Sequence, residues 1–236
     1  MGANKVSGTL VSAISKIDGV AKGSIASIMG ISVTPPFPNT YSLDFDGVDD
    51  YVDCGLGVGN HFGNSYTGGL TVSLWFKADT TSGDDGMIWI ATDGATNTHG
   101  VFNLNIQSNF IRFQNVATSK IAFTDTASWH HLVAVCDASA VTTGKLYLDG
   151  VLQSEYFTYS SYNLSNTRLH IGTYYNTSAY TFDGNIDEVS IWSSALSGAD
   201  VATLYNSGLP NNLKTALAST PVAWWRNGDS GTFFAG

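Results

Sequence analysis

Apolar and polar residues alternate along most of the chain between residues 41 and 192. In the segment TVSLWF, Val72, Leu74 and Phe76 fall on one face of an extended strand, whereas Trp75 falls on the other. Similar short runs, separated by Gly, Asn, Asp or Ser, are MIWIA, VFNLNI, FIRFQ, HLVAV, KLYLDGVL, RLHIG and IDEVSIW. Strands this short and numerous predict an all-β fold, a sandwich of two stacked antiparallel sheets.

Two local signals add detail to this sandwich. In LYLDGVL, Asp149 and Gly150 separate two apolar runs, which predicts a tight hairpin. Ser197 and Asp200 have the spacing of a helix start, and Gly208 supplies a stop after a few residues of helical periodicity. The sequence therefore predicts one short helix late in an otherwise β-structured chain.

The N-terminal segment contains a repeat of eleven residues, seen as ANKVSGT, ISKIDGV and IASIMGI. This spacing predicts three short extended segments separated by turns. Such a strip cannot bury its apolar side chains alone, so residues 1–34 are expected to form a small extended arm for anchoring or oligomerisation. The residues expected to make its contacts are Val6, Ile14, Ile17, Ile25 and Ile28. A disordered tail rich in Ser and Gly is the alternative.

The prolines of TPPFP mark the boundary after this arm. We expect a stiff linker over residues 35–40 and the sandwich over 41–209. Residues 210–236 contain Trp224 and Trp225 in the segment VAWWRNGDSG and are expected to form one further strand. These two tryptophans are also candidates for contacts between subunits.

Composition excludes several classes of function. The 236 residues include 10 Lys and Arg against 19 Asp and Glu, a net charge of −9, which argues against nucleic-acid binding. No apolar stretch approaches the roughly 18 residues that span a bilayer, and Lys16 and Lys22 interrupt the one candidate for a secretory signal. Cys54 and Cys136 could pair across a sandwich, but two buried free thiols are the favoured interpretation.

Several segments resemble the laminin-G-like jelly rolls of the concanavalin A-like lectin and glucanase superfamily, in the variety found in tailed-phage virion and bacterial surface proteins. They occur in the usual order of that family and span residues 41–208. The resemblance implies a two-sheet jelly roll with a surface role in binding or display. The matching segments are YSLDFDGVDDYVDCG, LTVSLWFKAD, WHHLVAV, GKLYLDGVL, LHIGTYYN, FDGNIDEVSIWSSALS and DVATLYNSG.

One departure from the family concerns the tryptophan-rich strand. In the family a similar strand often comes first, whereas VAWWRNGDSG lies at the end of this chain. We expect the terminal segment to fill the missing first-strand position, either in its own sandwich or in that of a neighbouring subunit.

The resemblance also implies a structural Ca²⁺ between an early acidic turn and a late acidic strand. Its expected ligands are Asp46, Asp49 and Asp187, since Ca²⁺ takes six to eight oxygens from carboxylates and backbone carbonyls. The alternative is a hairpin turn at Asp46 with solvated acidic side chains around it. Zinc is less favoured, because the adjacent His130 and His131 face opposite sides of a strand.

No set of residues fits a catalytic site. Glycoside hydrolysis needs two carboxyl groups flanking one bond. The chain has only Glu155 and Glu188 as glutamates, and neither begins the E-x-D-x-x-E pattern of the related glucanases. We therefore expect no enzymatic activity.

Two segments have the composition of binding loops, YFTYSSYNLSN at 156–166 and TYYNTSAYTF at 173–182. Rigid aromatic faces with short hydrogen-bonding groups suit contacts with glycans or proteins. A subunit interface, or tyrosines covering sheet edges, is the alternative. The candidate residues are Tyr159, Tyr162, Tyr174, Tyr175 and Tyr180.

The sequence interpretation is a non-enzymatic virion structural protein, as a capsid decoration or a fibre- or tail-associated display protein. It would be made in the host cytoplasm and carried on the virion surface. Its expected partners are other virion proteins, copies of itself, and host or environmental glycans. The alternatives are a calcium-dependent carbohydrate-binding module of a bacterial surface or extracellular assembly, and a self-assembling filament subunit.

Overall fold

The computed structural model contains two compact units, Met1–Pro38 and Asn39–Gly236. The boundary between them falls inside the predicted linker. The residues that the structure describes are 16–17, 20–21, 27–28, 31–32, 37–56, 69–92, 102–113, 119–137, 143–158, 167–174, 180–229 and 233–234.

In the first unit, the described residues form two small antiparallel hairpins. Strand β1 (Lys16–Ile17) pairs with β2 (Val20–Ala21), and β3 (Ser27–Ile28) pairs with β4 (Ile31–Ser32). The second hairpin repeats the first eleven positions later, which is the period read from the sequence. Ile17 and Ile28 therefore occupy equivalent places, whereas Val6, Ile14 and Ile25 lie outside the described residues.

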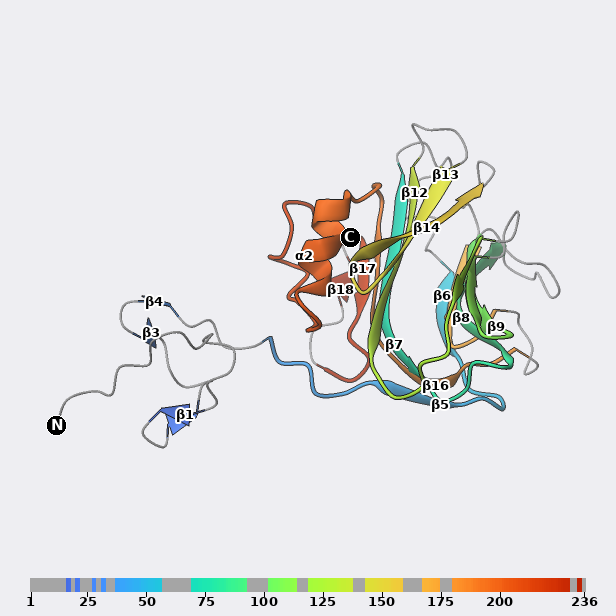
Figure 1. Ribbon diagram of the computed structural model, residues 1–236, viewed down its shortest axis with the longest axis horizontal. Helices are drawn as coiled ribbons and strands as arrows, with labels where there is room; N and C mark the ends of the chain where they lie inside the picture. The colour runs from blue at the N-terminus through green and yellow to red at the C-terminus, as the bar shows by residue number, and fades with distance from the viewer. Residues whose placement is uncertain are drawn as a thin grey trace. The chain divides into compact units, whose positions relative to one another are not determined.

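The second unit is a sandwich of two antiparallel sheets, as Figure 1 shows, so the predicted all-β jelly-roll fold is confirmed. The six-stranded sheet has the order β11 (Ser119–Ala122), β10 (Phe110–Phe113), β9 (Phe102–Gln107), β8 (Asp84–Thr92), β15 (Thr167–Ile171), β6 (Val52–Leu56). The eight-stranded sheet has the order β14 (Val151–Thr158), β13 (Thr143–Leu148), β12 (His130–Asp137), β7 (Leu70–Ala78), β16 (Asp183–Trp192), β17 (Ala223–Trp225), β18 (Phe233–Phe234), and β5 (Leu43–Asp46) also pairs with β16.

The core lies between the sheets and follows the alternation of the sequence. On β7, Val72, Leu74 and Phe76 are fully buried in this core, as expected. Opposite them, β8 contributes Ile88 and Ile90. Each such side chain stabilises the fold by roughly 1.5–3 kcal/mol relative to exposure. The core therefore fixes which residues of each strand point away from it.

Local signals place the turns and the helix where the sequence predicts them. Asp149 (φ 52°) and Gly150 (φ 76°) join β13 to β14, and positive φ at both positions is the geometry that a two-residue hairpin of type I′ requires. Helix α2 (Gly198–Tyr205) begins with a capping box between Ser197 and Asp200. It buries Val201 and lies beside the eight-stranded sheet (Figure 1).

Strand β16 organises the edge of the eight-stranded sheet. One side of it pairs with β7 throughout, whereas the other side pairs with β5 in its first half and with β17 in its second half. A bulge separates the two halves at Glu188, whose φ is +50°. The C-terminal segment thus fills, in its own chain, the position beside β16 that β5 leaves open.

Both cysteines are free thiols in the structure. Cys136 is buried in the core, and burial raises its pKa; burial, followed by the charge of Asp53, raises the pKa of Cys54 to about 12. Among the described residues, no helix is long and apolar enough to cross a membrane.

Candidate functional site

The outer face of the eight-stranded sheet carries the candidate site. Because Leu74 and Phe76 point into the core, Trp75 between them points outward. Its neighbours across the sheet are His131 on β12 and Asp187 on β16. Strand register therefore places an aromatic ring, an imidazole and a carboxylate in one row.

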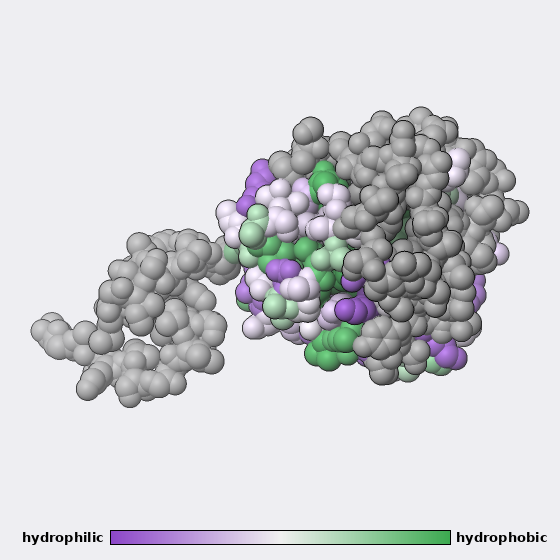
Figure 2. Space-filling view, turned by 90° about the horizontal axis from the view of Figure 1, so that it is seen from above, coloured by the Kyte–Doolittle hydropathy of each residue, from purple (hydrophilic) through white to green (hydrophobic). Residues whose placement is uncertain are grey.

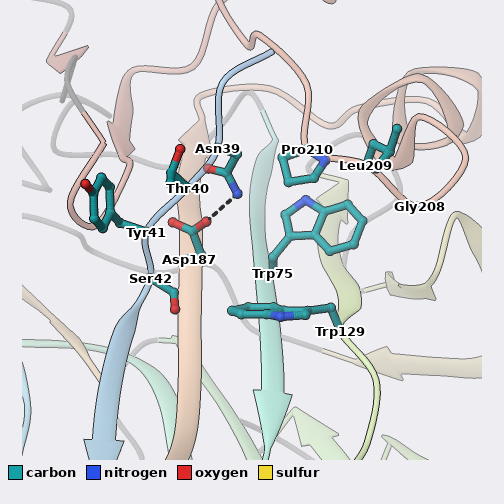
Figure 3. A pocket seen from close by; sticks show the side chains of 10 residues that line it. All are labelled: Asn39, Thr40, Tyr41, Ser42, Trp75, Trp129, Asp187, Gly208, Leu209 and Pro210. Atoms are coloured by element: carbon teal, nitrogen blue, oxygen red, sulfur yellow. Dashed lines mark hydrogen bonds between the residues drawn. The ribbon is translucent and has the colours of Figure 1, made fainter. Parts of the chain in front are cut away.

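A pocket of about 410 Å³ opens over this row (Figure 3). Residues 39–42, which lead into β5, form one wall, and residues 208–210, which follow α2, form another. The remaining lining side chains are Trp75, Trp129 and Asp187. Seen from above in Figure 2, apolar and polar side chains mix on the visible surface of the region around α2, and Leu209 at the pocket is 60% exposed.

Three aromatic residues of different exposure line the pocket: Tyr41, which is 61% exposed, and two tryptophans. Trp75 is only 5% exposed, because it stacks on His131 (5.0 Å between ring centroids) and on Tyr205 of α2 (5.9 Å). Trp129 precedes β12 and is 41% exposed. Figure 3 shows the two indole rings next to each other on the same side of the pocket. Trp75 is thus a rigid floor, and Trp129 is the ring that a ligand can cover.

The polar end of the pocket is built on Asp187. Its Oδ2 accepts a hydrogen bond from Nδ2 of Asn39 (2.7 Å), and its Oδ1 accepts one from the backbone N–H of Glu188 (2.7 Å). Burial raises the pKa of Asp187 to about 6 and the charge of Asp229 adds to this, while the two hydrogen bonds and Arg226 oppose it. The Oδ1 of Asn39 is buried and has no hydrogen-bond partner.

The C-terminal segment holds the wall formed by residues 39–42. The Oδ2 of Asp229 accepts the backbone N–H groups of Thr40 (2.8 Å) and Tyr41 (3.2 Å). Arg226 lies 3.9 Å from Asp229 and donates through Nε to Glu188 (3.2 Å). The pocket therefore depends on contacts between the beginning and the end of this unit.

This geometry suits binding of a hydroxylated ligand with an apolar face. Aromatic rings pack against such faces, and a carboxylate and an amide oxygen accept hydrogen bonds from hydroxyl groups. Asp187 is the one carboxylate that lines the pocket among the described residues. The adjacent Glu188 is 2% exposed and bonds instead to Trp224 and Arg226.

The predicted calcium ligands are only partly brought together. Carboxylate oxygens of Asp46, Asp49 and Asp50 lie within 4.8 Å of one another on the surface, so these residues could supply several of the oxygens that Ca²⁺ needs. Asp187 is not among them, because Asp46 pairs with Asp183 and Asp187 lies four residues, about 13 Å, further along β16. The structure thus assigns Asp187 to the pocket and leaves the acidic turn without it.

Two of the predicted glycan-binding tyrosines, Tyr174 and Tyr180, are described and do not line this pocket. Tyr174 is 3% exposed, packs on Tyr180 with ring centroids 4.6 Å apart, and donates through its hydroxyl to Asp84 (2.7 Å). It belongs with Trp89 to a small cluster on the six-stranded sheet. Tyr159, Tyr162 and Tyr175 lie outside the described residues.

The tryptophans predicted to contact other subunits are packed within this unit. Trp224 is 2% and Trp225 9% exposed, and both lie on β17 against β16. Whether the same strand also exchanges between copies stays a prediction.

The sequence interpretation missed Asn39, Trp75 and Trp129. A signal was available for Trp75, since a tryptophan on the outward side of an alternating strand needs a partner there. Trp129 stands two residues before the predicted strand HLVAV. Asn39 lies in the segment that the sequence interpretation treated as a linker.

A comparison with protein families supports the β-sandwich fold. A laminin G family model, described as the concanavalin A-like lectin/glucanases superfamily, matches residues 46–202. No curated protein matches the sequence.

Solved structures resemble the fold at low sequence identity. A protein of Bacteroides ovatus to which carbohydrate binding is ascribed aligns with 90% of this chain and 60% of its own length, at 16% identity and a TM-score of 0.60. The fourth domain of an extracellular arabinanase from Geobacillus stearothermophilus, in complex with arabinotriose, aligns over 70% of this chain and 76% of that domain, at 19% identity and a TM-score of 0.49. A heptameric pentraxin from Limulus polyphemus aligns over 72% of this chain and 80% of its own length, at 16% identity and a TM-score of 0.44.

Proposed function

Because the chain belongs to the concanavalin A-like lectin/glucanases superfamily, we propose that it is a non-catalytic carbohydrate-binding protein whose pocket at Trp129 and Asp187 holds a sugar residue. The observation that carries this proposal is the pairing of a half-exposed indole ring with two buried oxygen acceptors in one cavity. A volume of about 410 Å³ is within the range of small-ligand pockets, roughly 300–1,000 Å³. The ascription of carbohydrate binding to the Bacteroides protein supports the same class of function.

The arrangement of carboxylates supports binding without hydrolysis. A glycosidase needs two carboxyl groups at about 5–5.5 Å or 6.5–9.5 Å from each other, on either side of the bond to be cleaved. Asp187 has no such partner among the described lining residues. The adjacent Glu188 does not line the pocket and accepts a hydrogen bond from Arg226. We expect bound oligosaccharides to remain intact on prolonged incubation.

The proposal is tested on a glycan array followed by calorimetry with the best ligand. Trp129→Ala should weaken binding about tenfold or more, because an aromatic contact and its buried area are worth about 1.4 kcal/mol or more. Tyr51→Ala is the matched control, since Tyr51 is similarly exposed (43%) but packs against His170 of the six-stranded sheet, with the two rings tilted. Absence of binding across the array, or equal losses in the two variants, would reject the pocket as a sugar site.

We further propose that the domain is displayed on a virion surface, made in the host cytoplasm and assembled with other virion proteins. The support is the resemblance of the sequence to virion proteins together with the repeated hairpins of the first unit. The test is labelling of intact particles with an antibody against the protein. Labelling of a bacterial cell surface, with unlabelled particles, would favour the bacterial alternative.

A further inference from the structure

We infer that the pocket selects a neutral sugar residue with two neighbouring free hydroxyl groups, and that it discriminates against residues bearing a carboxylate. This inference specifies the ligand of the proposed carbohydrate site and rests on that function. Its basis is the balance of hydrogen-bond donors and acceptors at the polar end of the pocket.

The buried polar atoms at this end are acceptors. The Oδ1 of Asn39 is buried without a partner, although an amide oxygen accepts up to two hydrogen bonds. Each oxygen of Asp187 receives one hydrogen bond within the chain, which leaves further acceptor positions on both. A buried acceptor without a donor is unfavourable, so a ligand gains most by bringing donors to these atoms.

Neighbouring hydroxyl groups of a sugar are such donors. The Nδ2 of Asn39 donates to Oδ2 of Asp187 at 2.7 Å, so Asn39 presents its other atom, Oδ1, close to the carboxylate. One hydroxyl group can therefore donate to Asn39 and the next to Asp187. The apolar face of the same sugar ring then lies against Trp129, which is the more exposed of the two indole rings.

A carboxylate on the ligand would be opposed by charge, and it would bring further acceptors to an end of the pocket that lacks donors. Among the described lining residues, Asp187 is the one charged side chain, and none is Lys or Arg. The nearby Arg226 is bound to Glu188 and lies 3.9 Å from Asp229. Two like charges a few ångströms apart at a partly exposed site repel by one to a few kcal/mol, which corresponds to a discrimination of about tenfold or more.

The test uses matched oligosaccharides that differ at one carbon. The probes are glucose, galactose and mannose oligomers, each with its uronic-acid counterpart, and O-methylated forms of the neutral oligomers. Wild-type protein should bind one neutral oligomer about tenfold more tightly than its uronic partner, and should lose affinity for the O-methylated form. Equal or tighter binding of the uronic oligomer, or undiminished binding of the methylated one, overturns the inference while the carbohydrate function stands.

Variants separate the charge from the shape of the pocket. Asp187→Asn keeps the size of the side chain, and it should reduce the preference for the neutral oligomer to less than about threefold. Asp85→Asn is the control, since Asp85 is also a buried carboxylate (8% exposed) but lies on the six-stranded sheet. An unchanged preference in folded Asp187→Asn, or an equal change in the control, overturns the inference.

Asn39→Ala is a second variant in case Asp187→Asn does not fold, as judged by circular dichroism. It removes the unpartnered acceptor and should weaken binding of the neutral oligomer about tenfold; measured at pH 8, where Asp187 is ionised, it should preserve discrimination against the uronic one. Unchanged affinity in this variant contradicts the assigned role of Asn39. If no oligomer of the panel or the array binds wild-type protein, the proposed function itself has failed.

Discussion

Arg226→Met should destabilise the sandwich by an amount that depends on pH. Arg226 is 5% and Glu188 2% exposed, and Nε of the guanidinium donates to Oε1 of the carboxylate at 3.2 Å. The indole Nε1 of Trp224 donates to the other carboxylate oxygen. Methionine preserves much of the apolar stem, so the substitution chiefly removes the positive charge. Removing one partner of a buried ion pair costs about 3–5 kcal/mol when the other stays charged.

The dependence on pH follows from the carboxyl group that remains. Burial, together with the charge of Asp187, raises the pKa of Glu188 to about 7 from an ordinary value of 4.5. The protonated form therefore favours folding, and this contribution is lost as pH rises from 4.5 through about 7. Loss of Arg226 raises the pKa of Glu188 further, so at pH 6 the carboxyl group of Glu188 is neutral in the variant. We expect a loss of less than about 2 kcal/mol at pH 6 and about 3–5 kcal/mol at pH 9.

Urea unfolding followed by tryptophan fluorescence measures both losses against wild type at the same pH. The double variant Glu188→Gln with Arg226→Met leaves neither charge behind, and Trp224 can still donate to the amide oxygen. It should recover most of the stability that Arg226→Met loses at pH 9. The reasoning is refuted if Arg226→Met costs the same at both pH values, or if the double variant is as unstable as the single one.

Three further predictions concern the acidic turn, the pocket and the arm. If the acidic turn at Asp46 binds Ca²⁺, EDTA should lower the melting temperature by about 5–10 °C, since free Ca²⁺ at a hundred times its Kd stabilises the fold by about 2.7 kcal/mol. Asp46→Asn should abolish this difference, and an unchanged melting temperature of wild type in EDTA would exclude a stabilising ion. Because the pKa of Asp187 is raised to about 6, sugar affinity should fall as pH drops through 6 and the carboxylate takes up a proton; equal affinities at pH 8 and pH 5 would count against its role as an acceptor. Light scattering should give a larger oligomer for the full chain than for a chain beginning at Asn39, and a monomeric full chain would argue against an oligomerising arm.

The sequence predicts the sandwich well because its signals are local and repeated. Leu74 and Phe76 obey a period of two, and this period alone decides which side of β7 faces the core. The turn at Asp149 and the helix start at Ser197 depend on backbone preferences of a few neighbouring residues. None of these features requires knowledge of which strands are neighbours.

Exposure of individual aromatic residues is harder to predict, because it depends on contacts between distant segments. The composition of 173–182 indicates a binding loop, yet Tyr174 donates its hydroxyl to Asp84, ninety positions earlier, and is buried. Trp129 is exposed, although tryptophans are highly buried on average. Residue types alone do not separate these two cases.

The pocket depends on strand register and on one bulge, and the sequence does contain a trace of the bulge. Ile186, Val189 and Ile191 all enter the core, although the interval of three between the first two breaks the period of two expected of a regular strand. One extra residue must be accommodated there, and Glu188, with its φ of +50°, occupies that position. The bulge lets Asp187 remain beside Trp75 on the outer face while the rest of β16 keeps its apolar side inward. An odd interval between core positions, next to two adjacent carboxylates, is therefore the sequence feature from which this part of the site could have been found.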